Sequence, residues 1–161
     1  MADKKLTHLE PSGRAHMVDV SDKAESARWA KARAAVVMSP QTLALAQSGD
    51  LKKGDLRAAA ELAGVMAAKR TWELIPLCHP LPLAHVEVQA AFDEQLPGIQ
   101  ITASARTTAR TGVEMEALTA ACVAALTVYD MVKSAEPGVR ITDVRLVEKH
   151  GGRSGDVILE G

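Results

Sequence analysis

The residues best suited to chemistry in this sequence are polar groups beside apolar or glycine-rich segments. The first is Lys53, followed by Gly54 and Asp55, in a tight predicted connection between two helices. A lysine held there could transfer protons or contact a phosphate. A solvated turn in which Asp55 caps the next helix explains the same residues, so both interpretations stay open.

A second candidate is the pair Cys78 and His79, within the proline-rich run over 74–83. His79 could hydrogen-bond a ligand or act as an acid or base, or it could serve the structure alone. Zinc is not expected, because neither the C-x-x-C nor the H-x-x-x-H spacing occurs. We therefore predict no metal site at this loop.

Charged residues mark both ends of a long predicted helix. Glu114 and Glu116 fall in its first turn, where acids are favoured electrostatically, and Glu114 follows Thr111 at capping-box spacing. Asp130 and Lys133 lie near the other end, at i and i+3. An ordinary surface ion pair explains them. Their apolar neighbours favour partial burial instead, which would perturb both pKa values and allow proton transfer.

A glycine-rich segment near the C-terminus combines cations with a permissive backbone. It contains Lys149, His150, Arg153 and three glycines. Such a loop can surround a phosphate with N–H groups and positive side chains. The G-x-x-x-x-G-K-[ST] spacing of a P-loop is absent, and an ordinary C-terminal turn is the competing interpretation.

Periodicity and end signals predict the elements that must position these residues. Residues 25–38 are ambiguous, because helix propensity favours 25–35 while 35–38 favours a strand. Three prolines make 74–83 a rigid apolar loop. The remaining predictions are helices over 40–47, 54–72 and 112–135, and strands over 84–93, 99–107 and 139–149.

If residues 25–38 form a strand, the element order is β-α-α-β-β-α-β. We therefore predict an α+β, ferredoxin-like fold, with an antiparallel sheet and its helices packed on one face. The 161 residues contain no linker or repeat, so 1–161 is expected to form a single domain. Residues 1–24 are expected to be an extended N-terminal arm, fixed only when a ligand or partner holds it.

Composition excludes several classes of protein. A net charge of −1 gives no reason to expect nucleic acid or an anionic membrane. We expect no signal peptide and no apolar run long enough to span a bilayer. Cys78 and Cys122 show no disulfide-framework spacing, which predicts a cytoplasmic protein. Abundant alanine lets helices approach closely but buries little area, so either subunit contacts add stability or the chain is a closely packed monomer.

Several runs of residues resemble the cyclic pyranopterin monophosphate synthase family, and together they extend through most of the chain. The two most specific are IPLCHPL at 75–81 and TGVEMEALTA at 111–120. The other matching runs are LTH at 6–8, AHMVDV at 15–20, KGD at 53–55, AAKRTW at 67–72, YDM at 129–131, Lys149, GG at 151–152 and SGD at 154–156.

This resemblance implies an enzyme of molybdenum cofactor biosynthesis, a lyase acting on phosphorus–oxygen bonds. The implied substrate is (8S)-3′,8-cyclo-7,8-dihydroguanosine 5′-triphosphate, and the products are cyclic pyranopterin monophosphate and diphosphate. The family forms homohexamers as trimers of dimers. Asp130 matches its active-site aspartate, and Lys53 and Lys133 match lysines implicated in catalysis. The implied substrate-binding residues are Leu77, Cys78, His79, Glu114, Met115 and Lys69.

Elementary chemistry is consistent with these roles. Rearranging a purine into a pterin needs repeated proton transfers, which lysines of lowered pKa and an oriented aspartate can supply. Closing the cyclic phosphate expels diphosphate, so positive charge must meet the leaving group. Lys69, Arg153 and Lys149 are the candidates. No metal or other cofactor is required, although Mg²⁺ could accompany the polyphosphate.

The length of the long helix carries a geometric prediction. Glu114 and Asp130 lie sixteen residues apart on it, hence about 24 Å apart at the standard helical rise. One compact nucleotide cannot bridge that distance. We therefore predict that the pocket lies between subunits, with the two helix ends supplied by different chains.

Two other classes of function compete with the enzyme. A regulatory domain on the same fold would bind a small anion without turnover, and would not need Lys53, Asp130 and Lys133 together. An RNA-binding domain would need aromatic residues on the sheet to stack bases. The predicted strands offer only Phe92 and Trp29, so we expect a small-molecule nucleotide as partner and no nucleic acid.

Overall fold

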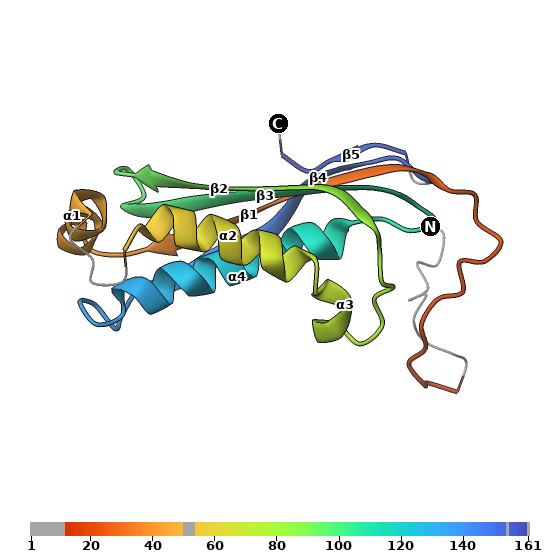
Figure 1. Cartoon of the computed structure of the whole chain (residues 1–161), viewed down its shortest axis with the longest axis horizontal. Helices are drawn as coiled ribbons and strands as arrows, with labels where there is room; N and C mark the ends of the chain where they lie inside the picture. Colours follow the sequence, from red (N-terminus) through yellow and green to blue (C-terminus); the bar gives the residue numbers. More distant parts are fainter. Residues whose placement is uncertain (1–11, 50–53, 154, 161) are drawn as a thin grey trace.

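The structure is a computed structural model that describes residues 12–49, 54–153 and 155–160. Within these residues the chain is α+β, with an antiparallel sheet accompanied by helices (Figure 1). The strands are β1 (Ser26–Val37), β2 (Leu83–Asp93), β3 (Gly98–Ala109), β4 (Arg140–His150) and β5 (Val157–Ile158), and the helices are α1 (Pro40–Ser48), α2 (Leu56–Ala68), α3 (Thr71–Leu74) and α4 (Glu114–Val132).

The ambiguous segment 25–38 forms strand β1, so the helical interpretation of 25–35 is wrong. From residue 30 to residue 36 every second side chain is buried, namely Ala30, Ala32, Ala34 and Val36. That period of two suits a strand with one covered face. Tertiary context overrides the helix propensity of this alanine-rich segment.

The sheet has the strand order β2-β3-β1-β4-β5, and all neighbouring strands are antiparallel. Helices α2 and α4 both lie against one face of it (Figure 1). The predicted hairpin of β2 and β3 is confirmed. The two-residue strand β5 at the sheet edge was not predicted. Because β1 runs against both neighbours, its beginning lies beside the ends of β3 and β4.

Small residues allow α2, α4 and the sheet to pack closely, as composition predicted. On α4, Ala117, Ala120, Ala121 and Ala124 are fully buried. Gly64 of α2 faces the carbonyl oxygen of Ala120, where an added Cβ would come within 2.9 Å. Any larger residue at 64 would push the two helices apart.

Local signals located the ends of α1 and the start of α2 correctly. Ser39 caps α1 and accepts from the Thr42 N–H, Pro40 follows at the first helical position, and Gly49 ends the helix with φ of 77°. Asp55 caps α2 by accepting from two backbone N–H groups. The predicted helix 54–72 is nevertheless interrupted, because a turn at 69–70 separates α2 from α3.

The helix α4 corrects two predictions. Its N-cap is Val113, with no side-chain cap, so the predicted capping box of Thr111 and Glu114 is absent. It is also long and apolar enough to cross a membrane, contrary to the expectation for this chain. More than half of its most apolar window is buried inside the domain, as in the core helix of a soluble protein.

Candidate functional site

Four segments far apart in sequence converge where β1 begins. Ser26 of β1 pairs with Ala109 of β3, and Trp29 pairs with His150 at the end of β4. The chain leaving β3 turns directly into α4, so the first turn of that helix reaches the same corner. Antiparallel pairing alone therefore brings together residues that the sequence separates by more than a hundred positions.

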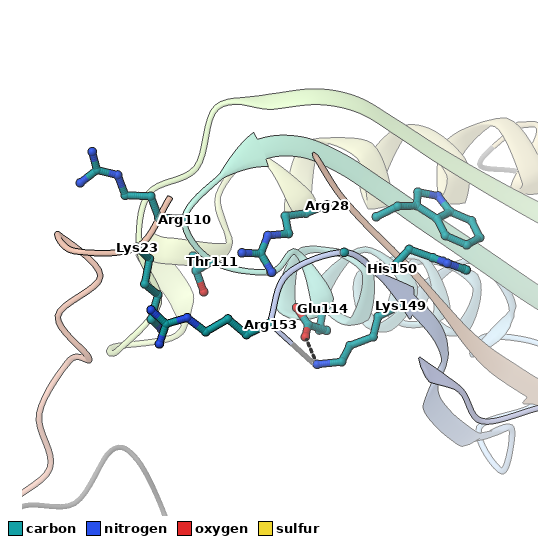
Figure 2. Close-up of a pocket in the computed structure, with 11 residues that line it drawn as sticks. Lys23, Arg28, Arg110, Thr111, Glu114, Lys149, His150 and Arg153 are labelled. Carbon is teal, nitrogen blue, oxygen red and sulfur yellow. Dashed lines mark hydrogen bonds and ion pairs between the residues drawn. The ribbon is translucent and has the colours of Figure 1, made fainter. Parts of the chain in front are cut away.

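A cationic pocket of about 210 Å³ opens at this corner (Figure 2). Five lysine and arginine side chains line it against one carboxylate, that of Glu114. The Glu114 carboxylate accepts from Lys149 Nζ at 2.8 Å. An excess of positive charge in a hollow favours an anionic ligand with more than one negative charge. The lining residues are Lys23, Arg28, Trp29, Arg110, Thr111, Gly112, Glu114, Lys149, His150, Gly151 and Arg153.

Arg28 is the least expected member of this pocket. Arg28 lies two residues before the buried Ala30, and alternate residues of a strand point to the same face. Its side chain therefore leaves β1 on the face that the helices cover. Its Nε is buried without a hydrogen-bond partner among the described residues. A buried cationic donor without a partner is costly unless a ligand satisfies it.

The uncapped N-terminus of α4 adds to the positive potential at the pocket. Its first N–H groups have no side-chain acceptor from a cap, and the helix continues for 19 residues. Helix N-termini of this kind favour anions. The glycine-rich turn after β4 also borders the pocket through Gly151, with φ of 89° at Gly151 and 81° at Gly152. These are conformations that glycine adopts readily.

A second hollow of about 360 Å³, here called the loop pocket, adjoins the first. The two share Lys23, Thr111, Gly112 and Glu114. Predicted substrate-binding residues gather here from the proline-rich loop and from α4. The loop pocket is lined by Val18, Val20, Lys23, Leu77, Cys78, His79, Leu81, Thr111, Gly112, Glu114, Met115 and Glu116.

Glu116 is a buried acid on the wall of the loop pocket, only 4% exposed. Burial raises its pKa to about 7, its own backbone N–H opposes that rise, and the charge of Glu114 adds to it. A carboxyl group with this pKa can both hold and release a proton near neutral pH. Glu116 is thus an acid of the first turn of α4, as predicted, but a buried one.

Cys78 lies half-buried in the same pocket. Burial raises the pKa of its thiol, and the Glu116 charge raises it further. Cys78 is a free cysteine, as is Cys122 on α4. A thiol of raised pKa is a poor nucleophile at neutral pH, so Cys78 is suited to contact a ligand rather than to attack one.

The described part of the N-terminal arm lies along the site. Val18 and Val20 line the loop pocket, and Lys23 lines both hollows. Arg110 fixes the arm by donating to the Ser21 carbonyl at 2.8 Å. This bond ties Ser21 to the end of β3. Residues 1–11 of the predicted arm lie outside the described residues, so the arm as a whole stays a prediction.

Asp130 and Lys133 lie at the opposite end of α4 from Glu114. Their side chains form an ion pair at 2.7 Å and are 53% and 52% exposed, so the predicted partial burial is wrong for this chain. Asp130 raises the pKa of Lys133, first by a hydrogen bond and then by its charge, where a lowered value was predicted. Within one chain neither residue reaches the two pockets.

Two further predicted lysines also lie apart. Lys53 is outside the described residues. Lys69, at the C-terminal end of α2, is exposed and borders a different hollow, beside Val65 and Leu83. The structure thus joins seven of the predicted residues around two adjoining pockets: Leu77, Cys78, His79, Glu114, Met115, Lys149 and Arg153.

Sequence reasoning missed three cations of the site, namely Lys23, Arg28 and Arg110. Only for Arg28 did the sequence contain a signal. It is a charged residue at a position that the alternating pattern of β1 places on the buried face. For metal binding, no cluster of three or more His, Cys, Asp or Glu side chains occurs within residues 12–49, 54–153 and 155–160.

The chain is similar to known proteins over most of its length. The sequence profile of the MoaC family matches residues 17–152. A protein of Methylobacterium sp. (strain 4-46) is 63% identical over 150 residues, covering 93% of this chain and 94% of its own length. Relatives from Methylobacterium nodulans and Dinoroseobacter shibae are 62% and 56% identical over the same length, covering 93% of this chain and 94% and 95% of their own. All three are named cyclic pyranopterin monophosphate synthase.

Proposed function

This chain belongs to the MoaC family of enzymes, and from that premise we propose that it makes cyclic pyranopterin monophosphate for molybdenum cofactor biosynthesis. The substrate is (8S)-3′,8-cyclo-7,8-dihydroguanosine 5′-triphosphate, and diphosphate is the second product. The purine is rearranged into a pterin with carbon supplied by the attached sugar, since a pterin has one ring atom more than a purine. The α-phosphorus gains a bond to a sugar oxygen and loses its bond to diphosphate.

The observation that carries this proposal is the junction of two unlike pockets at Glu114. The cationic pocket suits a triphosphate, because several charges can be neutralised at once. The loop pocket offers His79, Glu116 and apolar walls, which suit a heterocycle that must exchange protons. A cyclised nucleotide triphosphate has both halves in one molecule.

The roles of the residues follow from their chemistry. Lys149 and Arg153 meet the phosphates and stabilise the departing diphosphate. Leu77, Cys78, His79, Glu114 and Met115 hold the heterocycle and sugar. Asp130, Lys53 and Lys133 transfer protons during the rearrangement. Lys69 stays a prediction as a substrate contact. We propose no resident cofactor, and Mg²⁺ would enter only with the polyphosphate.

We further propose that the active site lies between subunits of a homohexamer. The support is the separation of Glu114 and Asp130 by the length of α4, about 24 Å at the standard rise. If the start of α4 in one chain lay against the end of α4 in another, the cationic pocket of the first chain would adjoin the Asp130–Lys133 pair of the second.

The fold and setting are part of the same proposal. The strand order β2-β3-β1-β4 with two helical crossovers on one face supports a ferredoxin-like topology, extended by β5. Residues 1–161 form a single domain in this proposal. We propose a cytoplasmic enzyme whose partners are a nucleotide and copies of itself, with neither nucleic acid nor membrane involved.

Turnover of the cyclised dihydroguanosine triphosphate by purified protein tests the proposal. Diphosphate and pterin are followed together for the wild type, Lys53→Ala and a control, Arg33→Ala. Arg33 pairs with Glu160 on the sheet, away from both pockets. Wild type and control should form both products, and Lys53→Ala should form neither while staying folded. Binding without release of diphosphate would favour the regulatory-domain alternative.

A further inference from the structure

His150, the last residue of β4, has a carboxylate at each of its two ring nitrogens. Nε2 lies 3.3 Å from Glu148 Oε2, and Nδ1 lies 3.2 Å from Asp156 Oδ2. The ring also packs on Trp29 of β1, with centroids 4.8 Å apart. Only the imidazolium donates from both nitrogens, whereas a neutral ring turns a lone pair toward one carboxylate. Both ring nitrogens can therefore donate to their carboxylates only when His150 is protonated.

Asp156 connects this imidazole to the glycine-rich turn. Its other oxygen, Oδ1, accepts a hydrogen bond from the Gly151 N–H at 3.1 Å. Gly155 in turn donates to the Gly152 carbonyl at 3.1 Å. One carboxylate thus determines how the chain leaves β4 and where the turn begins.

The same turn forms one wall of the cationic pocket. Lys149, Gly151 and Arg153 all line that pocket. Gly151 lies so close to β1 that an added Cβ would overlap the Ala27 carbonyl oxygen, and one on Gly152 would overlap the Arg28 guanidinium. The turn is therefore seated against β1, and Asp156 is the side chain that holds its first residue there.

We propose that His150 and Asp156 form a clamp that holds the glycine-rich turn against the cationic pocket, and that proton loss from His150 releases the turn and weakens binding of phosphate groups. His150 is a positioning residue in this scheme, because it acts through Asp156. The inference rests on the proposed function only in taking phosphate groups as the ligand of the cationic pocket.

The charges around His150 set the pH range of the clamp. Hydrogen bonds to Asp156 and then Glu148 raise the pKa of His150, against a smaller opposing effect of burial. From β1, Lys31 pairs with Glu148 at 3.0 Å, and from β3, Arg106 lies 5.8 Å from the Trp29 ring centroid. Arg28 of β1 is a third cation here, lining the cationic pocket together with His150. Because the pKa is raised, the clamp is complete at low pH and is lost as pH rises through that raised value.

Calorimetric binding of inorganic tripolyphosphate across pH tests the clamp without requiring turnover. At about pH 6 the wild type should bind roughly two- to fivefold more tightly than His150→Gln, and this difference should disappear as pH rises through the raised pKa of His150. Asp156→Asn should behave as His150→Gln does. The protonation of tripolyphosphate itself changes with pH. Because each variant is compared with the wild type at the same pH, this change affects both equally. His85→Gln, exposed on β2, is the matched control and should follow the wild type.

An NMR titration of the His150 ring provides an independent measurement. Its pKa in the wild type should lie above that in Asp156→Asn, and equal values would overturn the clamp. Normal tripolyphosphate binding by Asp156→Asn beside weak binding by His150→Gln would also overturn it, since His150 would then contact the ligand directly. If the wild type bound no tripolyphosphate at any pH, the pocket assignment of the proposed function would fail, and the NMR titration would still decide the clamp.

Discussion

The Nζ of Lys149 lies 2.8 Å from Oε1 of Glu114, so an ion pair joins the end of β4 to the first residue of α4. Both side chains are less than one-third exposed. Glu114 lines both pockets, and Lys149 lines the cationic one (Figure 2). An entering phosphate must therefore compete with the Glu114 carboxylate for the Lys149 ammonium.

The first prediction follows from this competition. Glu114→Gln removes the competing charge, so tripolyphosphate should bind roughly two- to fivefold more tightly. Lys149→Met removes a cation and should weaken binding by a similar or larger factor. Calorimetry at one pH and one ionic strength measures both effects. Turnover by Glu114→Gln should nevertheless fall, because the same carboxylate borders the loop pocket.

A control separates this effect from general loss of charge. Arg33→Met also breaks an ion pair, with Glu160, but lies on the sheet away from the pockets. Its tripolyphosphate affinity should equal that of the wild type. Weaker binding by Glu114→Gln would show that the carboxylate supports the site rather than competing within it.

The second prediction concerns the buried acid Glu116. Its pKa is raised from 4.5 to about 7, so the folded protein holds a proton that the unfolded chain releases in this interval. Folding stability therefore falls as pH rises from 4.5 to about 7. Glu116→Gln carries no charge at any pH. It should match the wild type near pH 4, below both pKa values, and exceed it by roughly 2 kcal/mol near pH 8, or about 5 °C in melting temperature.

Thermal unfolding at one protein concentration measures this difference. Glu73→Gln, on the exposed face of α3, is the matched control and should change the melting temperature little at either pH. A Glu116→Gln variant less stable than the wild type at pH 8 would mean that the ionised carboxylate is satisfied in the fold. Turnover should fall in Glu116→Gln even where stability rises, if the group transfers protons.

Features set by local residues could be read from the sequence. Ser39, Pro40 and Gly49 predicted both ends of α1, because capping depends on a few adjacent backbone groups. The prolines of the loop before β2 excluded a regular element there for the same kind of reason. Residues from both the IPLCHPL and TGVEMEALTA runs line the loop pocket, and their role in binding substrate stays a prediction.

Features that depend on distant partners could not be read in this way. The capping box failed because Val113 and not Thr111 occupies the N-cap position. Glu114 instead pairs with Lys149, which lies 35 residues away and could not be anticipated from the helix itself. Strand β1 looked helical because its burial pattern is imposed by two neighbouring strands and α4. Lys23 and Arg110 join the site through strand pairing and the course of the arm, which no spacing encodes.

The third prediction concerns a contact between the beginning of α1 and the chain after α4. Glu136 accepts from the Ser39 N–H at 2.9 Å and from the Ser39 hydroxyl at 2.8 Å. Ser39→Ala removes the cap and one of these bonds, so it should lower the free energy of unfolding by about 1 kcal/mol, or about 3 °C. Denaturant titration measures the change.

The same contact predicts a pH dependence. Hydrogen bonds from Thr42 and then Ser39 lower the pKa of Glu136. Its contribution is therefore present above the ordinary glutamate range and is lost as pH falls through the lowered value. Glu136→Gln should be less stable than the wild type at neutral pH, with the gap closing in acid. Glu94→Gln, exposed at the β2–β3 turn, should show no such gap. A gap of equal size at all pH values would rule out the carboxylate as its source.

The fourth prediction tests whether the active site is shared between subunits. His79→Ala damages the loop pocket at one end of α4, and Lys133→Ala damages the pair at the other. Each variant alone should be inactive. If a site takes its two halves from different chains, each half comes from a chain that is intact at that end with a probability of about one half. Random mixing in equal amounts should therefore make about one quarter of the sites intact and restore about one quarter of wild-type turnover.

The matched control for mixing uses two changes at the same helix end. Asp130 and Lys133 lie 2.7 Å apart in one chain, so mixing Asp130→Ala with Lys133→Ala should leave every site with a defect in that pair. Subunits are exchanged by joint refolding, and turnover is compared with that of each variant refolded alone. Since α4 separates Glu114 from Asp130 by about 24 Å, a site within one chain would need both ends of that helix to reach a single ligand. Mixing of His79→Ala with Lys133→Ala would then restore nothing, and the shared site would have to be abandoned.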